Sequence, residues 1–234
     1  MHLGILQCGH VPDEVAEKDG TYGALYGALF AHRDFEQTVW SVVDGDFPPD
    51  ATAADAWLVS GSRFGAYEDL AWIPPLEDFI RAIRAADLPL VGVCFGHQII
   101  AQALGGTVAK SDKGWRVGAQ TYRVGGASLR LNAWHQDQVT DLPPGATVHG
   151  SSDATDYAIL AIGPHILTVQ PHPEFPDSVV ETLIEVRGKA IEPDRLDAAK
   201  AALGHPDDSR LIADWLADVL EGADATRLPD EIAA

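Results

Sequence analysis

The sequence is poor in sulfur. Its 234 residues include two cysteines, Cys8 and Cys94, and one methionine. Two cysteines so far apart do not make a disulfide framework, so we expect a reduced, cytoplasmic setting. No turn motif surrounds Cys8, which is therefore expected to be a small core residue.

Long apolar runs are also missing. No segment approaches the roughly 20 consecutive apolar residues that a helix needs to cross a bilayer. The first residues, MHLGILQCGH, contain neither a basic leader nor a long apolar stretch. We therefore expect no signal peptide and no membrane association.

Positive charge is scarce. Lysine and arginine number 16 against 35 aspartates and glutamates, which gives a formal net charge of −19. A surface this acidic repels nucleic-acid phosphates and anionic membranes, so we expect a small-molecule substrate or a protein partner instead. Acidity also keeps a protein soluble whatever it does, so the charge does not indicate a reaction.

Strands and helices alternate in the first half of the sequence. Hydrophobic residues make up 46% of the chain, enough for the core of one large domain. Expected strands cover residues 3–8, 37–45, 54–62 and 88–94, and expected helices cover 22–30, 74–87 and 95–106. This order predicts an α/β fold with an open, mostly parallel sheet flanked by helices on both faces.

The character of the sequence changes after about residue 107. Short β-rich runs follow at 118–124, 128–131, 146–152, 157–163 and 165–170. They predict a small antiparallel section that returns to the main sheet near Gln170. Helices are predicted at 177–188, 194–203 and 209–222, and the last residues are expected to fray. We expect residues 1–190 to form one domain and residues 191–234 a helical extension packed on it.

The segment Gly92–Gly96, GVCFG, places a cysteine between two glycines where an apolar run meets a helix. This pattern is typical of a nucleophile elbow, a sharp strand-to-helix turn that exposes the central side chain at the carboxyl edge of the sheet. The positive end of the helix dipole favours the thiolate there, and the N–H of Phe95 can stabilise an oxyanion. A buried structural cysteine is the alternative for Cys94.

The segment QPHPEF, residues 170–175, supplies a candidate base. His172 and Glu174 are two residues apart at the end of an expected strand, so both side chains can face the same side. The flanking prolines restrict the backbone. A His–Glu pair can fix the imidazole tautomer and raise its basicity. An ordinary surface histidine in a proline turn is the alternative.

Taken together, GVCFGHQ and the distant HPE resemble the class I glutamine amidotransferases, whose Cys-His-Glu triad is carried by such an elbow and such a motif. SGSRFGAY, residues 60–67, is similar to the oxyanion loop of that family, and WHQDQV, residues 134–139, to its substrate-contact strand end. Order and spacing agree over about residues 3–187. The chain also resembles stand-alone members, namely the glutaminase domain of GMP synthases and the γ-glutamyl peptidases, and GWRVG at 114–118 is part of that likeness.

The resemblance implies a flavodoxin-like amidotransferase fold and gives roles to particular residues. Cys94 would be the nucleophile, His172 the general base and Glu174 its orienting acid. The backbone N–H groups of Ser62 and Phe95 would form the oxyanion hole. The implied substrate-binding residues are Gly61, Gln98, Trp134, His135, Gln136 and Asp137. Neither a cofactor nor a metal is implied.

The implied reaction is hydrolysis of the glutamine side-chain amide through a cysteine thioester, with release of ammonia. The sequence contains no P-loop and no long second domain that could use this ammonia. Either a separate synthetase subunit accepts the ammonia, or the chain is a stand-alone γ-glutamyl peptidase. Arg63 replaces the usual proline of the oxyanion loop, and Trp134 replaces a small or polar residue, so the substrate stays open.

Two other classes of protein remain as alternatives. In a metal-binding protein, His135 and Asp137 would gather with His172 and Glu174 around an ion. That reading leaves the elbow at Cys94 unexplained. In the other class, a non-catalytic binding module would keep the fold without its reaction, because a fold alone does not prove a function.

Overall fold

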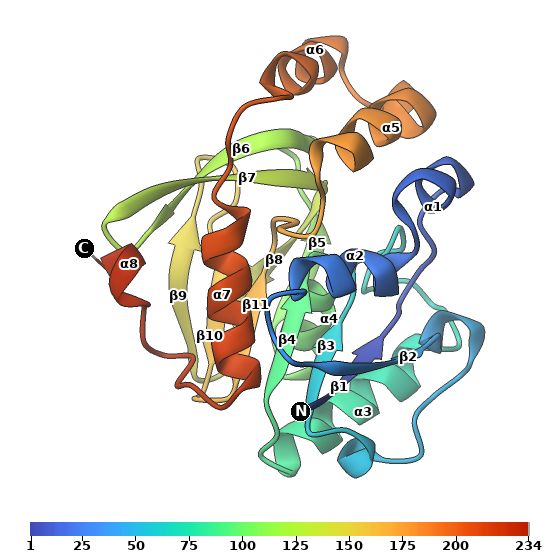
Figure 1. The fold of residues 1–234 in the computed structure, drawn as a ribbon, viewed down its shortest axis with the longest axis vertical. Coiled ribbons are helices and arrows are strands. Elements are labelled where there is room, and N and C mark those ends of the chain that lie inside the picture. Colours follow the sequence, from blue (N-terminus) through green and yellow to red (C-terminus); the bar gives the residue numbers. More distant parts are fainter. Residues whose placement is uncertain (234) are drawn as a thin grey trace.

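The structure, a computed structural model, describes residues 1–233. Within these residues, nine strands form one sheet in the order β2-β1-β3-β4-β11-β10-β9-β6-β7 (Figure 1). The neighbours from β2 to β11 are parallel, and those from β11 to β7 are antiparallel. The parallel strands are β1 (His2–Leu6), β2 (Glu36–Trp40), β3 (Ala56–Val59), β4 (Leu90–Val93) and β11 (Ile166–Val169).

The antiparallel section is built from the middle of the chain. Its strands are β6 (Arg116–Val124), β7 (Ala127–His135), β9 (Ala146–Ser151) and β10 (Ile159–Ile162). A separate two-stranded antiparallel sheet joins β5 (Thr107–Lys110) to β8 (Asp137–Asp141). The expected α/β fold, with a mostly parallel sheet and a smaller antiparallel part, is confirmed.

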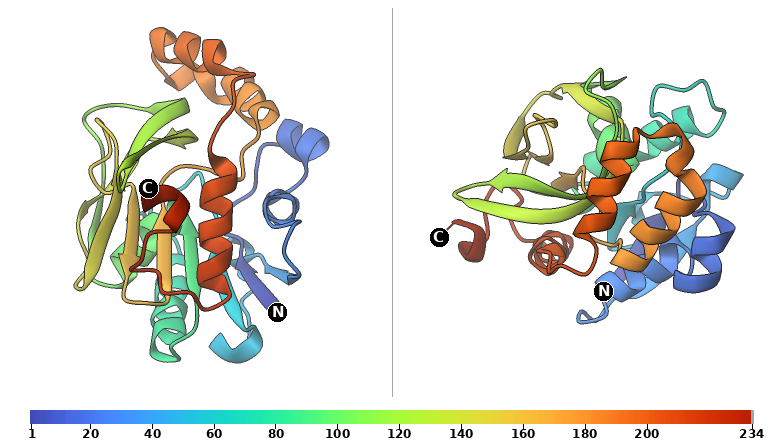
Figure 2. Two further views of the ribbon diagram at one scale, coloured as in Figure 1. Left: turned by 60° about the vertical axis from the view of Figure 1, so that its left-hand side comes forward. Right: turned by 90° about the horizontal axis from the view of Figure 1, so that it is seen from above.

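Helices cover both faces of the parallel strands. The helices are α1 (Asp13–Asp19), α2 (Tyr22–Leu29), α3 (Ile73–Ala85), α4 (Phe95–Ala103), α5 (Asp177–Arg187), α6 (Pro193–Ala202), α7 (Ser209–Leu220) and α8 (Asp230–Ala233). Single 3₁₀ turns lie at Val42–Asp44, Ala51–Ala53 and Gly188–Ala190. Figure 2 shows the sheet between these helices, with α7 running along one of its faces.

Alternation along each strand divides the core into two clusters. On β1, Leu3 and Ile5 belong to the cluster that includes α2, α5 and α7, whereas Leu6 belongs to the cluster that includes α3 and α4. On β4, Val91 faces the first cluster and Leu90 the second. Because both faces are buried, these strands consist of nearly continuous apolar residues, as expected for a parallel sheet covered by helices.

The C-terminal segment packs against the sheet. Helix α7 contacts β4, β11 and β7, and α6 contacts β6 and α5. The last residues do not fray as expected, because Asp230–Ala233 form α8 and bury Ile232. The proposed domain boundary at residue 190 stays a prediction. No helix within residues 1–233 is both long enough and apolar enough to cross a membrane.

The order of the strands decides where the candidate site lies. Strands β3, β4 and β11 are parallel neighbours, so their carboxyl ends meet at one edge of the sheet. Ser60, Cys94 and Gln170 directly follow these three strands. Ligands of open α/β sheets bind beyond this edge. The fold therefore brings the three predicted segments together, although they are far apart in the sequence.

Candidate active site

Cys94 occupies a strained turn between β4 and α4. Its backbone has φ +53° and ψ −102°, a combination that residues other than glycine rarely adopt. The N–H of Cys94 donates to the carbonyl oxygen of Val169 over 2.9 Å, which ties the turn to β11. Cys94 is 5% exposed and lines a cavity that His172 also lines. The elbow predicted from GVCFG is present.

The two glycines of the elbow are required by close packing. A Cβ on Gly96 would lie 2.1 Å from the carbonyl oxygen of Val59, so α4 approaches β3 more closely than any side chain allows. A Cβ on Gly92 would lie 2.7 Å from the backbone of Gly96 and 2.6 Å from Ile100. These contacts fix the start of α4, and with it the N–H of Phe95, next to Cys94.

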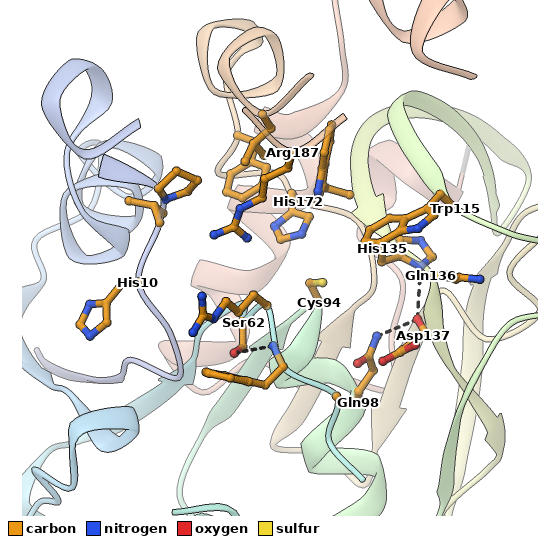
Figure 3. Close-up of a pocket in the computed structure, with 18 of the residues that line it drawn as sticks. His10, Ser62, Cys94, Gln98, Trp115, His135, Gln136, Asp137, His172 and Arg187 are labelled. Carbon is orange, nitrogen blue, oxygen red and sulfur yellow. Dashed lines mark hydrogen bonds between the residues drawn. The ribbon is translucent and has the colours of Figure 1, made fainter. Parts of the chain in front are cut away.

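His172 lies above Cys94 in Figure 3 and is held on three sides. Its Nδ1 lies 2.7 Å from Oε1 of Glu174. Its ring stacks on Phe175 at 4.0 Å between centroids and 5° between planes. Its backbone N–H donates to the carbonyl oxygen of Asn132 over 2.8 Å. The imidazole therefore has one orientation, with Nδ1 toward the carboxylate and Nε2 free for other contacts.

The charge on His172 is set by opposing effects. Burial alone would lower the pKa of this imidazole, but the Glu174 carboxylate and the Cys94 side chain outweigh burial and raise the pKa to about 10. Glu174 is itself buried and accepts a hydrogen bond from the Tyr26 hydroxyl over 3.2 Å. An imidazolium beside a thiol favours the thiolate, so the arrangement suits a cysteine nucleophile.

The predicted oxyanion donors are backbone N–H groups of the loop after β3, at Ser62, and of the first residue of α4, at Phe95. Neither the N–H of Ser62 nor that of Phe95 donates a hydrogen bond to another described residue. The Ser62 hydroxyl donates to the carbonyl oxygen of Cys8 over 2.7 Å, which fixes the loop after β3. Gly61 lies against the imidazole, since a Cβ there would be 3.1 Å from Cε1 of His172. Both N–H groups thus lack a partner among the described residues, as oxyanion donors must, while their role stays a prediction.

The thiol opens into a cavity of about 410 Å³. The predicted substrate-binding residues Gln98, Trp134, His135, Gln136 and Asp137 line it, whereas Gly61, Phe95 and Glu174 lie behind its wall. Nε2 of Gln98 donates to the carbonyl oxygen of Asp137 over 2.8 Å. Figure 3 shows this pair, with Gln136, on one side of Cys94. The structure therefore gathers the predicted residues, while their roles stay predictions.

A family model described as "Glutamine amidotransferase class-I" matches residues 30–184. The chain belongs to this family. The predicted membership, made from the elbow and the HPE motif, is thus confirmed. Strands β3, β4 and β11 precede the three segments of the site, and all three strands lie within the matched residues.

Two curated relatives illustrate the range of the family. "Gamma-glutamyl peptidase 4" from Arabidopsis thaliana is 30% identical over 214 residues, which cover 82% of this chain and 84% of the peptidase. "GMP synthase [glutamine-hydrolyzing]" from Parafrankia sp. is 35% identical over 167 residues, which cover 65% of this chain but 30% of the synthase. The chain therefore matches the peptidase over most of both lengths and the synthase over one part.

A solved structure shows the same fold. The crystal structure of a glutamine amidotransferase from Thermotoga maritima aligns with 94% of this chain and 96% of its own, with a TM-score of 0.69. The sequence identity is 20%, so this likeness concerns the fold alone.

Several residues of this amidotransferase-family site were not found from the sequence. Arg187 and Trp115 line the cavity, and Tyr67 donates its hydroxyl to Asp137 over 3.1 Å. Tyr26 was seen as one apolar residue of a helix, yet its hydroxyl reaches Glu174. No motif of the sequence marks Arg187 or Tyr26, and Tyr67 is the last residue of the segment SGSRFGAY, without a role assigned to it. Only GWRVG pointed to Trp115, which lies near Trp134 with 6.4 Å between ring centroids.

His135 does not behave as a second base. Burial, together with the charge of His172, lowers the pKa of His135 to about 3, so this imidazole is neutral. Its Nδ1 lies 3.3 Å from the carbonyl oxygen of Asp137. Residues 1–233 contain no group of three or more histidine, cysteine, aspartate or glutamate side chains that could hold a metal ion. The metal-binding alternative therefore lacks a ligand set.

Proposed function

We propose that the chain hydrolyses the side-chain amide of glutamine or of another γ-glutamyl compound through a thioester on Cys94. The observation that carries the proposal is the position of His172, fixed by Glu174 at 2.7 Å and placed beside an elbow cysteine in the same cavity. Both cysteines are free thiols, which suits a reducing, cytoplasmic setting.

The first half of the reaction forms the thioester. The Cys94 thiolate attacks the γ-carbonyl carbon, and the carbonyl oxygen becomes an oxyanion between the N–H groups of Ser62 and Phe95. His172, as the imidazolium, donates its proton to the leaving amine as the C–N bond breaks. With glutamine as substrate, the amine that leaves is ammonia.

The second half releases glutamate. Neutral His172 takes a proton from water, and the resulting hydroxide attacks the thioester carbon. The C–S bond breaks, glutamate leaves, and the thiolate and imidazolium are restored. Glu174 accepts a hydrogen bond from Nδ1 of His172, so that Nε2 is the nitrogen that exchanges the proton.

Two members of this reaction class differ in what happens to the amine. As a glutamine amidotransferase, the chain would pass ammonia to a separate synthetase subunit. As a γ-glutamyl peptidase, it would act alone and release an amino acid or a peptide. The match to an Arabidopsis γ-glutamyl peptidase over most of both lengths supports the second candidate.

The test measures glutamate released from glutamine, γ-glutamyl dipeptides and glutathione by the purified protein. Cys94→Ala should lower the rate about 10⁴-fold or more, because removal of a nucleophile leaves only binding and the oxyanion hole. Cys8→Ala is the matched control, since Cys8 is also buried but lies outside the cavity. Full activity in Cys94→Ala would overturn the proposed mechanism.

A further inference from the structure

Two arginines stand at one end of the cavity. Arg63 directly follows Ser62 in the loop after β3, and Arg187 is the last residue of α5. Figure 3 shows Arg187 beside His172, on the side of Cys94 that faces His10. The two guanidinium groups are close enough for Arg63 to lower the pKa of Arg187, after the larger effect of burial. The fold therefore holds two like charges near the thiol.

Neither guanidinium forms an ion pair with a carboxylate of residues 1–233, although the Glu14 carboxylate is near enough to oppose the lowering of the pKa of Arg187. Of the other arginines, six form ion pairs, among them Arg33 with three carboxylates and Arg123 with Asp153 at 2.7 Å, whereas Arg84, Arg116 and Arg130 form none. Arg63 lies over the Phe64 ring at 4.7 Å instead. What sets Arg63 and Arg187 apart is that both line one cavity without an ion pair, so their guanidinium groups are available to an anion from outside.

The position of the arginines assigns them to the leaving group. On the proposed function, the glutamyl part of the substrate lies toward Gln98, Gln136 and Asp137, on the other side of Cys94. His172 gives its proton to the leaving amine, and Arg187 is next to His172. The compartment that contains the arginines is therefore the one that the amine and its substituents enter.

This compartment also has an apolar wall. Val179 and Leu183 precede Arg187 on α5 by two turns and one turn, so all three share one face of the helix. All three line the cavity, together with Val11 and Val15 from the N-terminal segment opposite. Ammonia needs neither an apolar wall nor a cation. An amino acid with an apolar side chain and a free carboxylate matches both.

We propose that Arg63 and Arg187 bind the carboxylate of an anionic leaving group, so that the preferred substrate is a γ-glutamyl amino acid with an apolar side chain. The guanidinium forks suit a carboxylate, which each can hold through two parallel hydrogen bonds. The proposal rests on the proposed function and narrows its substrate. It also explains why an arginine stands where the family's oxyanion loop usually has a proline.

The test compares γ-glutamyl-leucine with its C-terminal amide, which lacks only the negative charge of the leaving group. Hydrogen bonds to charged groups are worth about 1.5–3 kcal/mol, so wild-type kcat/KM should be about 10- to 100-fold higher for the acid. This preference should fall severalfold in Arg187→Gln and in Arg63→Gln. Arg187→Lys should keep part of it, because the charge stays while the fork is lost.

Arg84→Gln is the matched control, since Arg84 is an exposed and unpaired arginine on α3, outside the cavity. It should keep the full preference for the acid. Equal rates of wild-type protein on acid and amide would overturn this proposal and leave the proposed function standing. An unchanged preference in both glutamine variants would overturn it too. Absence of glutamate release from every γ-glutamyl compound would instead refute the proposed function.

Discussion

Replacing Cys94 by glycine should stabilise the protein relative to replacing it by alanine. Alanine keeps a Cβ at φ +53° and ψ −102°, whereas glycine adopts such angles without strain. Because this combination lies outside even the small left-handed region, the strain belongs at the upper end of the usual range, about 3 kcal/mol. Neither variant has a thiol, so their difference isolates the backbone.

Two effects oppose this gain. Glycine gives up the burial of one methyl group, worth about 0.8 kcal/mol, and loses more chain entropy on folding, about 0.5–1 kcal/mol. The net gain of Cys94→Gly over Cys94→Ala is therefore about 1.5 kcal/mol, which raises Tm by about 3–6 °C in a chain of this size. Differential scanning calorimetry or urea unfolding of the two variants measures it.

Cys8 provides a control of opposite sign. Cys8 is buried like Cys94. Among the described residues other than glycine, positive φ occurs at Asp87 and Cys94, so the backbone of Cys8 is not in that strained region. Without strain to relieve, Cys8→Gly should be less stable than Cys8→Ala by about 1–2 kcal/mol. If glycine were also the less stable choice at position 94, the turn would not be strained and the reasoning would fail.

Two further predictions concern His172 and the start of α4. In Glu174→Gln the pKa of His172 should fall from about 10, because the carboxylate that raises it is gone, so the alkaline limb of the kcat/KM profile should move to lower pH. The pKa of His172 in the folded protein is above its ordinary value of about 6.5. The stabilisation that His172 gives the wild-type fold is therefore complete below about pH 6.5 and is lost as the pH rises to about 10. In Glu174→Gln this loss of stability with rising pH should be smaller. Gly96→Ala should destabilise the fold by about 1–3 kcal/mol and slow hydrolysis, because its Cβ collides with the Val59 carbonyl oxygen and displaces the N–H of Phe95.

Each of these has a neutral comparison. Glu185→Gln changes an exposed carboxylate on α5 and should leave the pH profile unchanged. Gly126→Ala adds a Cβ with nothing within 4 Å and should change neither stability nor rate by much. A Glu174→Gln profile that coincides with that of wild type would refute the role of the carboxylate, and a Gly96→Ala protein as stable as Gly126→Ala would refute the packing argument.

The sequence predicted those parts of the site that are encoded locally. The elbow at Cys94 needs two glycines at fixed spacing, and the HPE segment places His172 and Glu174 on one side, so both could be read directly. The role of Arg187 could not be predicted, because basic residues are common in the last turn of a helix. Arg187 lines the cavity only because of the way α5 packs in the fold. Tyr26 is similar, since its hydroxyl finds Glu174 across the fold.

The main strands and helices were predicted from periodicity, but four short elements were not. Helix α1 has seven residues and no side-chain cap at its start, so no end signal marks it. Strands β5 and β8 form their small sheet through pairing across a long stretch of chain, and the pairing of short strands is decided by such non-local contacts. The α8 helix was missed because the burial of Ile232 depends on a partner elsewhere.

The pairing of β4 with β11 also decides when Cys94 and His172 come together. A chain is synthesised from its amino end, so β4 is complete while the residues that will carry His172 are still unmade. Closing so long a loop is one of the slow steps of folding, and α7 covers the two strands only later in the chain. A nascent or partly folded copy therefore carries Cys94 without its imidazolium. The topology therefore brings the proposed nucleophile and its proposed base together only when the protein around them is finished.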